Sequence, residues 1–327
     1  MPFRDIAGHR HLFELVAGAA TRGTLPPSLI FAGPDGVGKR MAALALAQFV
    51  NCLQPTAEDA CGTCASCTRI ARLMHSDVLL IEPGDTGAIK VDQVRDAIER
   101  TGYRPFEGRR RVVVIDDADA MLGEAQNALL KTLEEPPASS MFVLVTSRPD
   151  MLLPTVRSRC QQLRFGRLAA EEIADVLAAA HGYSPAEARA AASVADGSVG
   201  QALEGGADEF VEAREAAADM LQRVAGSADP RRRLDGAKAL AGAGDRDELR
   251  RRLRALASML RDLSVLGVAA DEHYLANADV AADLRRLSAS FDPERITTAF
   301  AAVDRALEAV DRNASPKIVA DWLAFQL

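Results

Sequence analysis

Apolar and polar positions alternate along the first half of the chain as expected for strands separated by helices. Four short apolar runs predict strands at residues 28–32, 78–81, 112–115 and 141–145, and a short strand is expected at residues 162–165. Between them, apolar residues recur at helical spacing over residues 6–20, 41–50, 91–101 and 125–133. Strands that alternate with helices predict one α/β domain built on a parallel sheet.

The pattern changes near residue 166, beyond which only helical spacing is found. Two amphipathic segments, 169–181 and 186–195, come first, and the pair Gly205-Gly206 then marks a linker. Residues 208–327 carry long helical runs interrupted by Gly and Pro, which predict five or six helices. We therefore expect three domains, at residues 1–166, 167–206 and 207–327.

The composition is that of an ordinary globular protein. Of the 327 residues, 48% are hydrophobic and 26% charged, and no apolar run approaches the roughly 20 residues that span a bilayer. The amino terminus has no apolar core of a signal peptide, so we expect a cytoplasmic protein without a membrane partner. A net charge of −7 argues against general nucleic-acid coating and leaves room only for a local basic face.

The loop after the first predicted strand has the pattern of a phosphate-binding loop. Gly33, Gly38 and Lys39 fit G-x4-G-K, with Gly36 inside the loop, between a strand and a helix. Backbone N–H groups and the helix dipole then point at a bound phosphate. The next position normally carries Ser or Thr as a Mg²⁺ ligand, but here it is Arg40, which is cationic and has no lone pair to offer. Mg²⁺ is therefore not expected.

Two acids follow the third predicted strand, where an open α/β sheet meets its ligand. Asp116 stands where an NTPase holds Mg²⁺ through water, and Asp117 stands where a carboxylate orients the attacking water. The alternative is that both acids only cap the helix that follows.

Four cysteines predict a metal centre. Cys52, Cys61, Cys64 and Cys67 have the spacing C-x8-C-x2-C-x2-C, which suits a tetrahedral, structural Zn²⁺ site. Buried or disulfide-paired thiols are the alternative, which a cytoplasmic location disfavours. His75 is a possible extra ligand, although a packed histidine is the commoner case.

Taken together, these motifs resemble the clamp-loader branch of the AAA+ ATPases. The resemblance covers residues 1–205 and rests on the phosphate loop, the four cysteines, the acid pair, and two distinctive pieces, Leu133-Glu134-Glu135-Pro136-Pro137 and Ser158-Arg159-Cys160. It implies an AAA+ P-loop domain with an inserted zinc module, a small helical lid domain and an all-helical collar domain for oligomerisation. It also places Thr146 at the family's sensor position.

Two departures resemble the members of that family that do not hydrolyse ATP. Arg40 replaces the metal-binding hydroxyl, and Gly200 stands where the family's ATPases carry an arginine for the nucleotide. The resemblance then implies a stator in a hetero-pentamer that places a ring-shaped sliding clamp on primed DNA. Implied partners are ATPase subunits of the gamma/tau type and a delta-type subunit.

Arg159 is the residue that we expect to act in catalysis, in trans, at a neighbour's ATPase site. An arginine supplied by a neighbour can raise the rate of phosphoryl transfer by roughly 10³–10⁵. The alternative role is a surface arginine in a local ion pair. The chain's own loop either supports strand–helix packing alone or holds ATP or ADP without metal.

Two other functions compete with the stator. An active ATPase would recruit its metal through Asp116, Asp117 and water. A zinc-dependent DNA-binding module would bind DNA tightly and in a salt-sensitive manner, which the net charge of −7 and a closed four-cysteine site disfavour.

Overall fold

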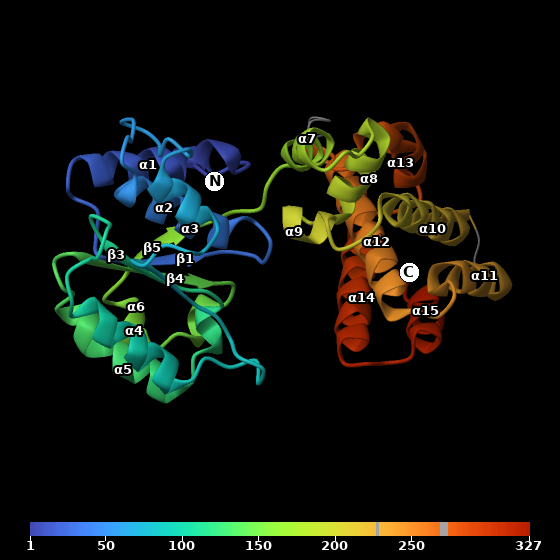
Figure 1. The fold of residues 1–327 in the computed structure, drawn as a ribbon. Coiled ribbons are helices and arrows are strands. Elements are labelled where there is room, and N and C mark those ends of the chain that lie inside the picture. Colours follow the sequence, from blue (N-terminus) through green and yellow to red (C-terminus); the bar gives the residue numbers. More distant parts are fainter. Residues whose placement is uncertain (227–228, 269–273) are drawn as a thin grey trace. The chain divides into compact units, whose positions relative to one another are not determined.

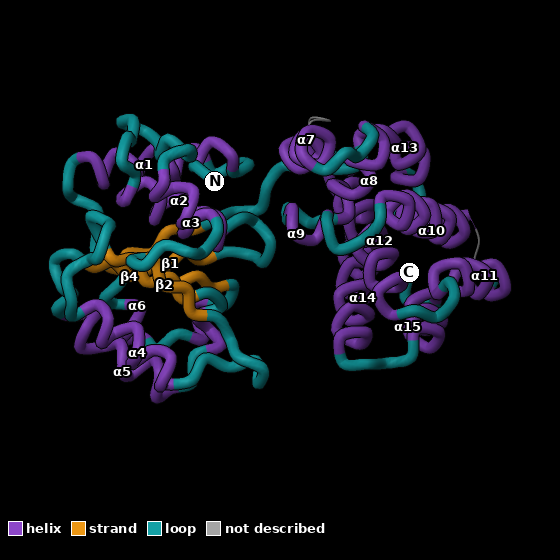
Figure 2. The backbone as a smooth tube through the Cα atoms, in the orientation of Figure 1, coloured by secondary structure: helices purple, strands orange, loops and turns teal. Residues whose placement is uncertain are grey.

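The structure, a computed structural model, describes residues 1–226, 229–268 and 274–327. Residues Met1–Arg167 form one unit of the chain and Leu168–Leu327 form a second (Figure 1). Strands occur in the first unit, and the described part of the second is helical (Figure 2). Whether the second unit separates into a lid and a collar domain stays a prediction.

The first unit is built on five parallel strands in the order β2-β3-β4-β1-β5. Their bounds are β1 Ser28–Ala32, β2 Val78–Ile81, β3 Arg111–Ile115, β4 Ser140–Thr146 and β5 Gln161–Arg164. Each lies within one residue of its expected bounds, and the predicted parallel α/β sheet is confirmed. The chain leaves the adjacent strands β1 and β4 in opposite directions, so the carboxyl edge between them is the switch point at which open α/β sheets bind ligands.

Helices cover both faces of this sheet. One face carries α1, α2 and α3, and the other carries α4, α5 and α6 (Figure 1). Their bounds are α1 Arg10–Thr21, α2 Lys39–Asn51, α3 Ala65–Ala71, α4 Val91–Thr101, α5 Gly123–Glu134 and α6 Pro154–Arg157, with short 3-10 turns at Phe3–Asp5, Ala118–Ala120 and Pro149–Met151. A sheet covered on both faces explains why the interior strands β1, β3 and β4 are largely continuous apolar runs, whereas the edge strand β5 is polar.

Successive residues of each central strand enter the two cores in turn. In β3, Val112 and Val114 pack on the side of α2, whereas Val113 and Ile115 pack on the side of α5. All four side chains are fully buried. The period of two in a strand therefore builds two cores from one uninterrupted run of branched residues.

Helix α1 begins later than predicted. Gly8 and His9 both adopt left-handed backbone conformations, with φ of 64° and 53°, and these break the helical spacing that starts at residue 6. Two short helices were not predicted: α3, whose first turn is capped by the Cys64 sulfur, and α6, which begins at Pro154. Both are too short to show a hydrophobic period.

The loop before β3 is held by two buried polar side chains. The Asp77 carboxylate accepts hydrogen bonds from the backbone N–H groups of residues 106, 107 and 108, each at 2.8 Å. The Asn51 side-chain oxygen accepts from the N–H groups of residues 109 and 110, at 2.8 and 2.9 Å. Five consecutive backbone amides are thus bound by two side chains.

A buried ion pair anchors the same loop. Arg111 Nη2 donates to Asp77 Oδ1 at 2.8 Å, and the Asp77 side chain is fully buried. Burial alone would raise the pKa of Asp77, but the amide N–H groups and the Arg111 guanidinium outweigh it and lower that pKa to about 2.

The second unit contains nine α-helices within its described residues. Their bounds are α7 Ala170–Ala180, α8 Pro185–Val194, α9 Val199–Ala202, α10 Ala207–Gly226, α11 Pro230–Ala241, α12 Arg246–Gly267, α13 Ala281–Ser288, α14 Pro293–Asp311 and α15 Pro316–Ala324, with a 3-10 turn at Ala278–Val280. Helix α12 packs against α10 and α14, and prolines occupy the first turns of α11, α14 and α15, where their missing N–H is not needed. Among the described residues, no helix is both long and apolar enough to cross a membrane.

We predict that Asp77 makes the stability of the first unit sensitive to acid. Its pKa in the folded chain lies below its usual value of 3.8, so its stabilising contribution is complete above about pH 4 and is lost as the pH falls through about 2. Asp77→Asn, which leaves the Arg111 charge buried and unpaired, should lower the free energy of unfolding at neutral pH by about 3–5 kcal/mol. As the pH falls from 4 to 2, the difference in the free energy of unfolding between Asp77→Asn and the wild type should decrease by about 2 kcal/mol.

Differential scanning calorimetry provides the measurement. Asp96→Asn, at an exposed aspartate of α4, is the control and should leave unfolding unchanged. A constant difference between Asp77→Asn and the wild type across this pH range would contradict the prediction.

Candidate functional site

The predicted phosphate loop lies at the switch point of the sheet. It leaves the carboxyl end of β1 and enters α2 at Lys39, with Gly38 as the residue that caps the helix. Gly36 and Gly38 have φ of 71° and 93°, a left-handed conformation that glycine adopts most readily. The loop therefore has the strand–turn–helix geometry expected from its sequence.

Packing alone already requires glycine at the start of this loop. A Cβ added to Gly33 would lie 2.2 Å from the carbonyl oxygen of Phe165, just beyond β5. At Gly38 the added atom would touch Ile6 at 3.4 Å. These glycines thus have structural reasons to be present whether or not a phosphate binds.

Lys39 is turned onto its own loop. Its ammonium donates to the carbonyl oxygen of Pro34 at 2.6 Å and lies 3.6 Å from Asp35 Oδ1. The residue is 6% exposed, and burial lowers its pKa although Asp35 opposes that shift. Internal acceptors occupy the group that would otherwise reach a nucleotide phosphate.

Arg40 binds the carboxylate of Asp116, the position at which an NTPase holds its metal. Its Nη1 donates to Asp116 Oδ2 at 3.2 Å and also to Glu82 Oε1. Burial, together with Asp117, raises the pKa of Asp116, and the Arg40 charge opposes this rise. The Arg40 guanidinium thus supplies at Asp116 the positive charge that a divalent cation would supply. Unlike a metal ion, it donates hydrogen bonds and cannot coordinate ligands.

Thr146, at the end of β4, is also engaged by neighbours within the unit. Its hydroxyl donates to Asp119 Oδ1 at 2.7 Å and accepts from the Arg148 N–H at 3.0 Å. Burial opposes ionisation of Asp119, but the hydrogen bonds from Thr146 and Arg148 prevail and lower its pKa. The sensor position is therefore part of a closed strand-end network.

Asp117 completes the acidic edge. It is exposed and has a left-handed φ of 47°. Partial desolvation of its carboxylate raises its pKa, and the nearby carboxylates of Asp119 and Asp35 raise it further. The structure thus places Lys39, Arg40, Asp116, Asp117 and Thr146 at one edge of the sheet.

Two acidic residues of this edge were not predicted. Glu82 pairs with Arg40, and Asp119 binds Thr146. Glu82 directly follows β2, so the reasoning that identified Asp116 after β3 could have found it. Asp119 lies in a 3-10 turn and had no comparable pattern in the sequence.

Arg159 lies at the opposite edge of the sheet. It precedes β5, whereas the phosphate loop follows β1, and the two strands run parallel. The length of a strand, about 13 Å for four residues, therefore separates Arg159 from its own loop. Arg159 cannot take part in the site that the other predicted residues form.

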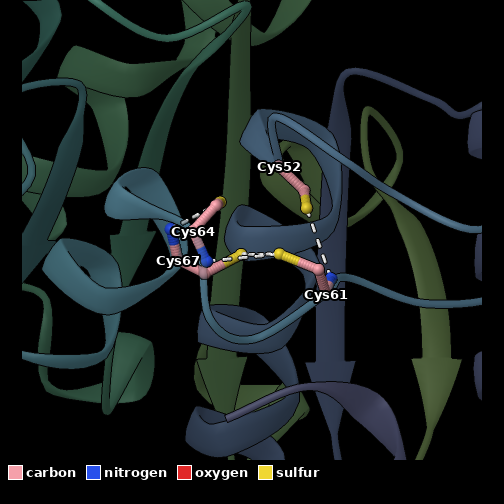
Figure 3. A group of neighbouring side chains, drawn as sticks. All are labelled: Cys52, Cys61, Cys64 and Cys67. Carbon is pink, nitrogen blue, oxygen red and sulfur yellow. Dashed lines mark hydrogen bonds between the residues drawn. The ribbon is translucent and has the colours of Figure 1, made fainter.

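The four cysteines converge as their spacing predicts. Cys52 ends α2, Cys61 and Cys64 lie in the following loop, and Cys67 lies in α3 (Figure 3). All four sulfur atoms lie within 4.8 Å of one another, and those of Cys61 and Cys67 are 4.0 Å apart. Ligands at about 2.3 Å from a tetrahedral zinc lie about 3.8 Å from each other, so this cluster could hold such a metal ion.

Backbone N–H groups point at two of these sulfurs, and the pKa values of the four thiols shift in different directions. The N–H of Cys61 points at the Cys52 sulfur, and that of Cys64 at the Cys61 sulfur, both at 3.3 Å. Hydrogen bonds from the backbone of Cys64 and Thr63 lower the pKa of Cys61 to about 6, whereas burial raises the pKa of Cys67. Four thiolates at this separation need a cation to offset their repulsion.

His75 lies outside the cluster. Its Nε2 contacts the Ser66 hydroxyl at 3.2 Å, and its Nδ1 accepts from the N–H of Asp77 at 3.1 Å. Burial lowers its pKa. Both ring nitrogens are engaged in the core, so His75 is a packed histidine and not a fifth ligand.

The cysteine loop also binds the amino-terminal segment. Asp59 accepts hydrogen bonds from the N–H groups of Phe3 and Arg4 at 2.9 and 3.2 Å, and the Arg4 guanidinium donates to the carbonyl oxygen of Cys61 at 2.9 Å. Further along this segment, the Ile6 side chain lies 3.4 Å from the place that a Cβ on Gly38 would occupy. The segment thus spans from the cysteine loop to the phosphate loop.

Comparison with known proteins gives a consistent picture. The family described as "DNA polymerase III, delta subunit" matches residues 8–169. DNA polymerase III subunit delta' of Pseudomonas aeruginosa is 40% identical over 157 residues, which cover 48% of this chain and 48% of that protein. DNA polymerase III subunit tau of Bacillus subtilis is 34% identical over 171 residues, 52% of this chain and 30% of that protein. The chain therefore matches less than half the length of these relatives.

One solved structure aligns over most of the chain. It is a DNA polymerase III gamma-subunit-related protein from Thermotoga maritima, with 18% identity, a TM-score of 0.46, and coverage of 95% of this chain and 97% of that one. A likeness this loose carries no argument about function.

We predict that Arg40 controls the ionisation of Asp116. Arg40→Ala removes the cation that opposes burial and Asp117, so the pKa of Asp116 should rise further. Titration of the side-chain carboxyl resonances by NMR measures this shift. Arg40→Lys, which keeps a cation, is the matched control and should shift this pKa less. An unchanged pKa of Asp116 in Arg40→Ala would show that the pair is not formed in solution.

Proposed function

Because the chain is a member of the DNA polymerase III clamp-loader family through its first unit, we propose that it serves there as a delta-prime-type stator that does not hydrolyse ATP. In this proposal it occupies one place in a hetero-pentamer with ATPase subunits of the gamma/tau type and a delta-type subunit. Through that complex it helps to load the sliding clamp onto primed DNA, as part of the polymerase holoenzyme.

The ion pair between Arg40 and Asp116 is the observation that carries this proposal. Hydrolysis in P-loop NTPases needs Mg²⁺ between the loop hydroxyl and an acidic strand end. Here Arg40 stands in place of the residue that carries the hydroxyl, and its guanidinium binds the Asp116 carboxylate. The closed contacts of Lys39 and Thr146 support the same conclusion. We propose that the loop serves chiefly in packing, with ATP or ADP held without metal as the alternative.

The position of Arg159 supports its role at a neighbouring site. It lies at the sheet edge opposite its own loop, and its side chain is 30% exposed. Guanidinium is always charged and presents a planar set of donors, which suits the charge that develops on a transferring phosphoryl group. The proposed role is to donate this group in trans to an adjacent ATPase subunit.

An active ATPase subunit is the alternative. It requires that Asp116 exchange Arg40 for a hydrated metal ion, and it predicts ATP turnover by the isolated chain that Lys39→Ala abolishes. A zinc-dependent DNA-binding module has less support, because the cysteine loop is occupied with binding the chain's own amino-terminal segment.

Arg159→Ala should leave the free chain as inactive as the wild type and impair the assembled complex. Turnover at the neighbouring ATPase site should fall by roughly 10³ or more, since that site loses its arginine. Single-turnover ATP hydrolysis by the reconstituted complex measures the effect. Arg157→Ala, two residues earlier and paired with Asp150, is the matched control. Normal hydrolysis by the Arg159→Ala complex would refute the proposed function.

We further propose that Cys52, Cys61, Cys64 and Cys67 hold one structural Zn²⁺ per chain. Cys64→Ser should lose the metal and speed hydrogen exchange of residues 3–6, because the loop that binds them loses its centre. Metal analysis and exchange mass spectrometry provide the two measurements. Cys160→Ser, at a cysteine outside the cluster, should keep both properties. Metal-free wild-type protein with the same slow exchange would contradict this proposal.

A further inference from the structure

The two distinctive sequence pieces, Leu133–Pro137 and Ser158–Cys160, meet in one ion pair. Arg159 Nε donates to Glu134 Oε1 at 2.9 Å, and Arg159 Nη2 donates to the same oxygen. We propose that Glu134 is a positioning residue that orients the Arg159 guanidinium for the neighbouring ATPase site. This inference rests on the proposed role of Arg159 in trans.

The hydrogen bonds to Glu134 and Thr155 leave two of the N–H donors of the Arg159 guanidinium available. An arginine has five N–H donors, and Glu134 accepts from two of them. The carbonyl oxygen of Thr155 accepts a third, from Nη1 at 2.8 Å. One donor on each terminal nitrogen remains, and charge-assisted bonds from such donors to phosphate oxygens are strong. The hydroxyl of Ser158 is a longer contact, 3.5 Å from Nη1, that an incoming oxyanion can replace.

Glu134 itself has a fixed place in the fold. It is the last residue of α5, and the two prolines at 136 and 137 prevent the helix from continuing. The preceding Leu133 is buried in the core, and α5 packs against α6, which carries Thr155. The two acceptors of Arg159 therefore come from two elements that pack together.

Orientation, not stability, is the expected contribution of this pair. Glu134 and Arg159 have side chains that are 50% and 30% exposed, and partly exposed ion pairs stabilise a fold only weakly. A free arginine samples many rotamers, whereas a guanidinium already bound along one edge needs less ordering when a phosphate arrives. Glu134 thus holds Arg159 ready without occupying the donors that it uses.

The test uses the complex reconstituted with its ATPase subunits and measures ATP hydrolysis at the neighbouring site. Glu134→Ala should lower kcat about tenfold and leave KM for ATP nearly unchanged, because orientation matters in the transition state. Glu134→Gln keeps an uncharged acceptor of the same length, so it should lower kcat only about threefold. Glu135→Ala, at the exposed next residue, is the matched control and should behave as the wild type.

A double-variant cycle separates this inference from the proposed function. Glu134→Ala combined with Arg159→Ala should be no slower than Arg159→Ala alone, because Glu134 acts through Arg159. If Glu134→Ala lowers kcat by the same factor in both backgrounds, or equals the wild type while Arg159→Ala is impaired, the inference fails and the proposed function stands. Normal hydrolysis by the Arg159→Ala complex would refute both the inference about Glu134 and the proposed function. If Glu134→Ala does not assemble, Glu134→Gln decides: kcat equal to the wild type overturns the inference.

Discussion

The ion pair between Arg40 and Asp116 determines what the carboxyl edge of the sheet can do. Asp116 follows the central strand β3 and is partly buried beside a second acid, so it needs a positive charge close by. In a metal-dependent NTPase that charge arrives with the nucleotide and leaves with the product. Here it is covalently part of the chain, on the residue after the loop lysine. The Asp116 charge is therefore balanced before any ligand binds. Lys39 and Thr146, at the same edge, also bind partners within the unit.

Arg40 and Arg159 lie at opposite edges of the sheet because its strands are parallel. Residues that follow strands gather at one edge, and residues that precede strands gather at the other. Arg40 follows β1 and Arg159 precedes β5, so the two side chains lie at opposite edges of the sheet. In a ring or arc of similar subunits, such an arrangement lets each interface combine the loop of one chain with the arginine of the next. Under the proposed function, a subunit whose loop does not hydrolyse ATP would still contribute Arg159 to its neighbour.

The sequence predicts the elements of the first unit better than their mutual contacts. Strands buried on both faces appear as continuous apolar runs, and four thiols at metal-binding spacing reveal their cluster before folding is considered. Short elements such as α3 carry no period that could be detected. The acids that bind Arg40, Thr146 and Arg159, namely Asp116, Asp119 and Glu134, are 76, 27 and 25 residues away, and only the folded sheet brings them together. The sequence indicates candidate residues for the site, whereas the structure shows which acceptor each of them contacts.

The loop before β3 has a consequence for how the chain tolerates change in length. Surface loops usually accept insertions and deletions readily. In this loop each amide from 106 to 110 is matched in order to Asp77 or Asn51, and a Cβ on Gly108 would lie 2.7 Å from the Asn51 oxygen. One inserted residue would displace every later amide by up to about 3.5 Å and leave a buried carboxylate short of donors. The segment therefore fixes the number of residues between the end of α4 and the start of β3, in a place where the length of a loop is usually free to vary.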